Sequence, residues 1–150
     1  SDLDVLGRVR PNVGANLALS NQISNQNHFD TDPQRLKFTG GYYNYWEVRG
    51  GPGVGLTFLK TLVSVNAGYE YAARFYTARL AQAEDGGYMG DKLTSVSQSV
   101  FVTAGYPLWR SLDFKARGTW SSTSSNTRFE QMYKYNYYDY NYFAGIEWKL

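Results

Sequence analysis

Residues 63–75, VSVNAGYEYAARF, indicate the fold class because their side chains alternate in character with a period of two. Apolar or aromatic residues occupy the odd positions, whereas Asn66, Glu70 and Arg74 occupy even positions. Side chains on a β-strand point alternately to opposite faces of the sheet. The segment therefore predicts a strand with one apolar and one polar face.

The same alternation recurs along the chain. It runs through residues 9–19, 36–58, 96–108, 112–120 and 138–150. The segment 36–58 is the least regular, because GGPG at residues 50–53 interrupts it as a bulge, a bend or a turn. If GGPG is a bend inside one long strand, the chain has six strands. A typical strand has about 5 to 6 residues, whereas a strand tilted across a bilayer needs roughly 9 to 11.

The composition excludes several classes of protein. The chain has 150 residues, enough for one domain, and its 15 Lys and Arg against 13 Asp and Glu give a charge of +2, too little for a nucleic-acid footprint. The absence of cysteine excludes a disulfide scaffold, a thiolate metal site and a cysteine nucleophile. No apolar run is long enough for a membrane-spanning helix. The 14 tyrosines and 15 glycines favour β-structure. No signal peptide is recognisable at Ser1, which leaves a cytosolic, a processed or a partial chain.

Long and short connections alternate between the predicted strands. The long ones, rich in Ser, Asn, Asp or Gly, are residues 21–35, 78–92 and 121–136, and the short ones are residues 60–61 and 109–111. Three up-and-down hairpins follow, with every long loop at one end of the strands and every tight turn at the other.

This arrangement resembles the outer-membrane β-barrel proteins of Gram-negative bacteria. Such barrels combine strands of about 10 alternating residues with short periplasmic turns, long extracellular loops and aromatic girdles. The end of the chain is similar to the last strand that the barrel assembly machinery reads, with Gly145, Trp148 and Leu150 at its characteristic places. Two positions depart from that pattern, since Leu150 stands where Phe is usual and Phe143 where a polar residue is usual.

The resemblance implies an all-β fold, a transmembrane antiparallel up-and-down β-barrel to which this chain contributes about 6 to 8 strands. It implies a non-enzymatic outer-membrane protein without a cofactor, acting as a pore, an export component or a membrane anchor in a larger assembly. The implied partners are outer-membrane lipid, lipopolysaccharide and the barrel assembly machinery, and nucleic acid is not among them. Bacterial single-chain barrels have even strand numbers from eight upward. Six strands therefore mean that two strands are merged here, that the chain is the C-terminal part of a larger barrel, or that several chains complete one barrel.

Two sets of residues acquire roles under this resemblance. Aromatic girdles at the two membrane surfaces would contain Tyr106, Trp109 and Trp148 near the short turns, and Tyr69, Tyr71, Phe75, Trp120, Tyr140 and Tyr142 towards the long loops. The polar face would line the lumen with Arg10, Lys37, Glu47, Glu70, Arg74, Asp113, Lys115, Arg117, Asp139, Glu147 and Lys149. These nearly balanced charges predict a lumen laced with ion pairs. The alternative is a weakly cationic pore wall centred on Lys115 and Arg117.

Other chemistry is compatible with parts of the sequence. His28 with Asp30 or Asp32 resembles the loop-rim His and Asp of outer-membrane barrel enzymes, in which a carboxylate orients an imidazole base. Asp30 with Asp32, or residues 84–85 with Asp91, could collect Ca²⁺, although neither matches an EF-hand. The aromatic run at residues 133–138 could stack on sugars or bases. A soluble lipocalin-like barrel that binds an apolar ligand is the remaining alternative, and it predicts purification without detergent.

Overall fold

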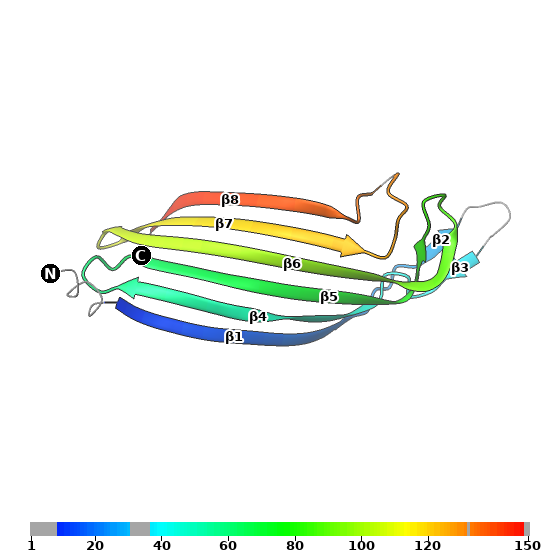
Figure 1. The fold of residues 1–150 in the computed structure, drawn as a ribbon, viewed down its shortest axis with the longest axis horizontal. Helices are drawn as coiled ribbons and strands as arrows, with labels where there is room; N and C mark the ends of the chain where they lie inside the picture. The colour runs from blue at the N-terminus through cyan, green and yellow to red at the C-terminus, as the bar shows by residue number, and fades with distance from the viewer. Residues whose placement is uncertain (1–8, 31–36, 132, 149–150) are drawn as a thin grey trace.

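Six long antiparallel strands, each joined to the next in the chain, dominate the structure. It is a computed structural model that describes residues 9–30, 37–131 and 133–148. The main sheet runs in the order β1 (Val9–Gln22), β4 (Tyr45–Phe58), β5 (Ser64–Gln82), β6 (Tyr88–Trp109), β7 (Leu112–Ser125) and β8 (Tyr137–Trp148). Two short strands, β2 (His28–Asp30) and β3 (Lys37–Thr39), form a separate pair at one end of the long strands (Figure 1). In the described part of the chain, no helix has the length and apolarity needed to cross a membrane.

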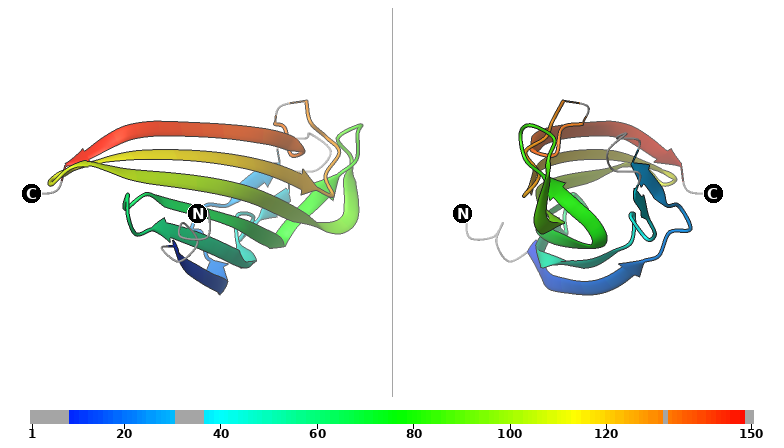
Figure 2. Two further views of the ribbon diagram at one scale, coloured as in Figure 1. Left: turned by 60° about the vertical axis from the view of Figure 1, so that its left-hand side comes forward. Right: turned by 90° about the vertical axis from the view of Figure 1, so that its right-hand side faces the viewer.

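The main sheet curls around an axis parallel to its strands and forms a trough, whose two margins are β1 and β8 (Figure 2). Every neighbouring pair of strands is antiparallel. Within the described residues β1 and β8 do not pair with each other, so the sheet is open rather than a closed barrel. The predicted all-β class and the six antiparallel strands are confirmed, while closure stays a prediction.

The two faces of the trough differ in polarity. Across the sheet, the register places Glu47 opposite Arg74, Arg74 opposite Ser95, and Thr123 opposite Tyr137. These residues line a hollow on the concave side, which identifies that side as the polar face. The alternate residues therefore lie on the convex side. They are mostly apolar or aromatic along all six strands.

The sheet encloses no large apolar core. In the described chain, the buried hydrophobic residues are Tyr42, Ala72, Ala73, Ala81 and Leu93. Among the described residues, no large side chain falls below 2% exposure. Instead the convex face leaves its apolar side chains uncovered, as Leu17 at 82% exposure and Trp148 at 72% illustrate. A soluble sandwich or barrel has the opposite arrangement, with its apolar residues packed inside.

The predicted bend at residues 50–53 lies inside the single strand β4, as the sequence suggests. Gly51 is required there because a Cβ would stand 1.9 Å from the carbonyl oxygen of Tyr69 on the neighbouring strand. The prediction of one strand over residues 36–58 is wrong at its beginning. β3 ends at Thr39, and a turn follows in which the Asn44 amide donates to the Gly41 carbonyl at 2.9 Å. Gly41 adopts a φ of 65° there, which favours glycine.

The predicted long loops are shorter than their composition suggests. Residues 78–82 and 88–92 continue β5 and β6 as a hairpin, with register shifts after Phe75 and Leu80, and residues 121–125 belong to β7. Ala81, Leu93 and Thr127 are almost completely buried where residues 126–131 pack against this hairpin. The Gln82 amide donates to the Thr127 hydroxyl at 2.8 Å. Packing of this small cluster keeps the polar segments extended, which composition alone does not reveal.

Candidate functional site at the mouth of the trough

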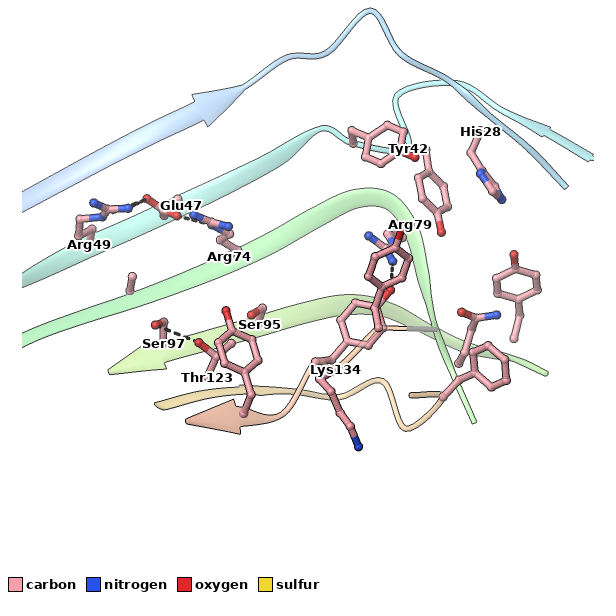
Figure 3. A pocket seen from close by; sticks show the side chains of 18 of the residues that line it. His28, Tyr42, Glu47, Arg49, Arg74, Arg79, Ser95, Ser97, Thr123 and Lys134 are labelled. Atoms are coloured by element: carbon pink, nitrogen blue, oxygen red, sulfur yellow. Dashed lines mark hydrogen bonds and ion pairs between the residues drawn. The ribbon is translucent and has the colours of Figure 1, made fainter. Parts of the chain in front are cut away.

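A hollow of about 710 Å³ opens on the concave face where the long strands meet the loops. Side chains from β4, β5, β6 and β7 form its deeper part. Residues from the turn after β3, from the segment between β7 and β8 and from the start of β8 form its rim (Figure 3). We call this hollow the mouth. It has the size of ordinary small-molecule sites, which span about 300 to 1,000 Å³.

A network of charges forms one wall of the mouth. Glu47 is only 6% exposed and accepts hydrogen bonds from Arg74 Nε and from Arg49 Nη2, the latter at 2.8 Å. Arg49 also reaches Glu70, with Nη1 3.8 Å from a carboxylate oxygen. Glu47, Arg49 and Arg74 lie together on the adjacent strands β4 and β5 (Figure 3). Two partly exposed guanidinium groups thus compensate the buried carboxylate, which would otherwise be costly.

Arg79, near the loop end of β5, is surrounded by tyrosine rings. Its guanidinium carbon lies 4.9 Å from the ring centre of Tyr42, 5.6 Å from that of Tyr76 and 5.4 Å from that of Tyr135. Arg79 Nη2 also donates a hydrogen bond to the hydroxyl of Tyr135. Cations over aromatic faces are stabilised by about 0.5 to 2 kcal/mol. Arg79 therefore ties three separate segments of the chain together at the mouth.

Tyr42, in the turn that precedes β4, is the most buried ring at the mouth. The imidazole of His28 stacks on it with ring centres 4.3 Å apart and planes inclined by 26°. Burial raises the pKa of the Tyr42 phenol, and the nearby Arg79 partly offsets that shift. The phenol therefore stays protonated and neutral at neutral pH.

Glu130 organises the segment between β7 and β8. Its carboxylate accepts hydrogen bonds from the backbone amides of Tyr135 and Asn136, at 3.1 and 2.8 Å, and from the side-chain amide of Asn136 at 2.9 Å. These hydrogen bonds, first the one from the Asn136 side chain, lower the pKa of Glu130. The carboxylate thereby holds Tyr135 in the position from which it meets Arg79.

Small side chains form the floor of the mouth. Ala72, Ser95, Ser97 and Thr123 line it, and the Thr123 hydroxyl donates to that of Ser97 at 3.2 Å. Because these side chains are short, they leave open volume between the charged wall and the aromatic rim. The open volume is a consequence of residue size at these positions in β5, β6 and β7.

The structure places most of the predicted lumen residues on the concave face. By register and alternation, that face carries Arg10, Glu47, Glu70, Arg74, Asp113, Lys115, Arg117, Asp139 and Glu147. Lys37 lies in β3, outside the main sheet, and its side chain is not among those described, so its predicted place in a lumen stays a prediction. The prediction for Lys149 falls outside the described residues. That the concave face is a lumen stays a prediction.

Only some of these residues come together. Glu47, Glu70 and Arg74 meet at the mouth, whereas Lys115 and Glu147 form an ion pair of 2.8 Å near the tight turns. The guanidinium of Arg117 lies over the ring of Phe101 at 5.5 Å. The predicted cationic centre at Lys115 and Arg117 is therefore a set of partnered side chains away from the mouth.

The predicted girdle residues of the main sheet lie on the convex face. Tyr106, Trp109 and Trp148 lie beside the tight turns, and Trp109 and Trp148 share the partner Leu112. The other group is Tyr69, Tyr71, Phe75, Trp120, Tyr140 and Tyr142. Tyr69, Trp120 and Tyr140 lie in one register row across β5 to β8, whereas Phe75 lies six residues nearer the loops, opposite Thr94. Trp120 Nε1 donates to the Tyr142 hydroxyl at 2.8 Å. That these residues form girdles stays a prediction.

The C-terminal pattern is described as far as Trp148. Gly145 and Trp148 lie on β8, and Leu150 falls outside the described residues. The unusual Phe143 lies beside Gly145, where an added Cβ would stand 2.8 Å from its ring. Gly68 and Phe101 form a similar pair on the same face. An aromatic ring that covers a glycine supplies packing which the missing side chain cannot.

The alternative of a loop-rim dyad at His28 is not tested by the described residues. His28 stacks on Tyr42, the side chain of Asp30 is not described, and Asp32 lies outside the described residues. Among the residues that are described, no three His, Cys, Asp or Glu side chains gather as a metal site would require.

Sequence alternation does not single out Arg49, Arg79 and Tyr42, which are central to the mouth. Arg49 shares the parity of Glu47 two residues before it, a pattern that could have revealed it. Arg79 lies in a segment predicted as a loop, and Tyr42 in a segment predicted as a strand, so their encounter depends on the protruding hairpin and the turn. No protein-family model, curated protein or solved structure matches this chain.

Proposed function

We propose that this chain contributes six strands to a non-enzymatic β-barrel in the outer membrane of a Gram-negative bacterium, as a pore, an export component or a membrane anchor. One observation carries the proposal: the curled sheet has its polar residues inside and its apolar residues outside. A lipid bilayer favours this arrangement. Its hydrocarbon surrounds the apolar side chains on the outside of the sheet, while the polar side chains lie inside, away from the hydrocarbon.

The extent of the apolar face supports this environment. Large uncovered side chains occur on every strand of the main sheet, among them Val13, Leu56, Tyr71, Val100, Phe114 and Tyr142. Soluble monomers rarely expose a contiguous apolar patch of more than about 300 to 600 Å². Tyr106, Trp109 and Trp148 add tyrosine and tryptophan rings beside the tight turns, and such rings prefer the level of the lipid headgroups. The lipid and lipopolysaccharide of the outer membrane are the proposed partners of this face.

Further strands are needed to close the proposed barrel. Six strands spaced about 4.8 Å apart and tilted by about 40° give a circumference of only about 38 Å, and even eight strands leave an interior just wide enough for side chains. The concave face carries large residues such as Arg49, Arg74 and Phe101, which need more room. The margins β1 and β8 are antiparallel to each other in the meander and can both accept further strands. We expect these strands from the same parent chain or from other subunits, inserted by the barrel assembly machinery.

The proposal is tested by the surroundings that the protein requires. The chain should need detergent to remain dispersed, should float with phosphatidylcholine vesicles in a density gradient, and should retain a β-sheet circular dichroism spectrum there. Folded, monomeric protein in plain buffer would overturn the membrane assignment. Native mass spectrometry of the detergent-extracted particle then tests closure: a single closed chain of 17.0 kDa would contradict the requirement for further strands.

A further inference from the structure

We propose that the mouth of the trough binds a short, uncharged oligosaccharide. The inference deepens the proposed function, on which it rests, because it names the class of ligand at the concave face of the same sheet. Three properties of the mouth support it: ring faces exposed at the rim, partnered planar polar groups on the wall, and a floor of small residues.

Aromatic rings at the rim remain accessible. Tyr137 is 46% exposed, Tyr133 is 71% exposed and Tyr43 is 38% exposed, and all three line the mouth. The rings of Tyr42 and Tyr135 are already covered by His28 or Arg79. Tyrosine rings offer an apolar face and a hydroxyl, and the C–H faces of sugar rings stack on such surfaces. The rim therefore suits a ligand built of several saturated rings.

The wall supplies groups that match pairs of adjacent hydroxyls. Guanidinium and carboxylate groups are planar and can form two parallel hydrogen bonds with neighbouring polar atoms. The side chains of Arg49 and Glu70 are 42% and 34% exposed, so part of each planar group faces the open volume. Their mutual contacts and those with Glu47 hold them in place before any ligand enters, which reduces the entropic cost of binding.

The charge balance favours an uncharged ligand over an anion. Each cationic side chain of the described lining already has a partner: Arg49 and Arg74 contact Glu47, Arg79 contacts tyrosines, and Lys134 lies 3.7 Å from a carboxylate oxygen of Glu130. Figure 3 shows the Lys134 side chain directed away from the charged wall. An anion would have to compete with these contacts, whereas a sugar can use the remaining donors and acceptors of the same groups.

The floor sets the depth to which rings can enter. The side chains of the floor are short: Ala72, Ser95, Ser97 and Thr123. The hydroxyls of the two serines and the threonine add uncharged hydrogen-bond donors and acceptors. The resulting hollow is open to the loops, so a chain of sugar units can lie along it with its ends outside. Length rather than one deep anchoring group then determines affinity.

Ligand titrations of the full chain in a zwitterionic detergent test this inference, because a detergent with a sugar headgroup would occupy the site. Maltotriose, cellotriose and chitotriose serve as probes, and saturation-transfer NMR detects their contacts with the protein. Inorganic phosphate is the anionic comparison, and its binding is followed by the broadening of its phosphorus NMR resonance. We expect at least one trisaccharide to bind through its ring C–H protons and phosphate not to bind. Binding of phosphate alone, or of no trisaccharide, would overturn the inference.

Two neighbouring tyrosines provide a matched pair of variants. Tyr137 faces the mouth, whereas Tyr138 lies on the convex face of the same strand. Tyr137→Ala should weaken trisaccharide binding about 5-fold or more, and Tyr138→Ala should leave it unchanged. Equal losses in the two variants would contradict a site at the mouth. If the folded protein floats with vesicles but binds no sugar, only the sugar inference is disproved. If the protein is monomeric in plain buffer and binds sugar, only the proposed membrane function is disproved.

Discussion

An arginine in place of Val100 should destabilise the protein strongly in a bilayer. Val100 is 46% exposed on the convex face, between Tyr69 on β5 and Trp120 on β7. The predicted girdle residue nearest the loops is Phe75, and its partner on β6 is Thr94. At about 3.3 Å per residue, the six residues from Thr94 to Val100 span about 20 Å along β6, or about 15 Å in depth for a strand tilted by about 40°. This exceeds the reach of an arginine side chain, so the guanidinium would remain in hydrocarbon.

The expected loss is about 2 to 4 kcal/mol, the cost of an arginine on the lipid face near the bilayer midplane. It corresponds to an unfolding constant raised about 30- to 900-fold. Ser99→Arg is the matched control, because Ser99 is the preceding residue on the concave face and lies opposite Glu70. There the new charge meets water and a carboxylate, and the expected change is below about 1 kcal/mol.

Urea unfolding from phosphatidylcholine vesicles, followed by tryptophan fluorescence, measures both variants. The denaturant slope should remain that of the unsubstituted protein, so that a shifted midpoint reports stability. Thr103→Arg would be a poorer control than Ser99→Arg, because Thr103 lies opposite Arg117 and the substitution would place two cations side by side. Equal losses from Val100→Arg and Ser99→Arg, or a greater loss from Ser99→Arg, would refute the assignment of the two faces.

Further substitutions test the other structural elements. Glu47→Gln should destabilise the fold by about 1 to 3 kcal/mol in the same urea assay, because the guanidinium groups of two arginines lose their shared carboxylate. Both arginines are partly exposed, so the loss should be smaller than for a fully buried ion pair. Gly51→Ala should prevent folding in vesicles, since its Cβ would collide with a backbone carbonyl, whereas Gly14→Ala meets nothing within 4 Å and should fold normally. Since Glu130 has a lowered pKa, its stabilising contacts are complete above the ordinary carboxyl pKa and are lost as the pH falls through the lowered value. Hydrogen exchange at the Asn136 amide should therefore accelerate at acid pH beyond the intrinsic trend, and Glu130→Gln should abolish that dependence; an unchanged profile would contradict this role for the carboxylate.

Alternation along the chain predicts the six strands and their two faces because backbone geometry alone determines which side chains share a face. The bend at residues 50–53 is predictable for the same reason: a strand keeps its parity through GGPG, and Val48 and Val54 accordingly remain on the convex side. The alternation of side chains is therefore sufficient to predict a strand and its two faces, because both follow from the local backbone geometry.

The mouth depends on contacts that no local pattern contains. Arg79 meets Tyr42 and Tyr135 only because β5 and β6 continue beyond the predicted strand ends and because Glu130 holds the segment after β7. Those continuations are stabilised by burial of Ala81 and Leu93, a tertiary effect on residues whose surroundings in sequence are polar. Composition therefore predicts loops where packing produces a hairpin.

The strictly sequential order of the main sheet has an evolutionary consequence. In the described main sheet each strand pairs only with its neighbours in the chain order of that sheet, so the ladder of a hairpin such as β6 with β7 continues only to β5 and β8. A duplicated or deleted hairpin preserves antiparallel pairing and leaves the facing of every remaining side chain intact. Such a sheet can change its width by gene duplication in steps of two strands, while substitutions at the mouth alter its chemistry independently.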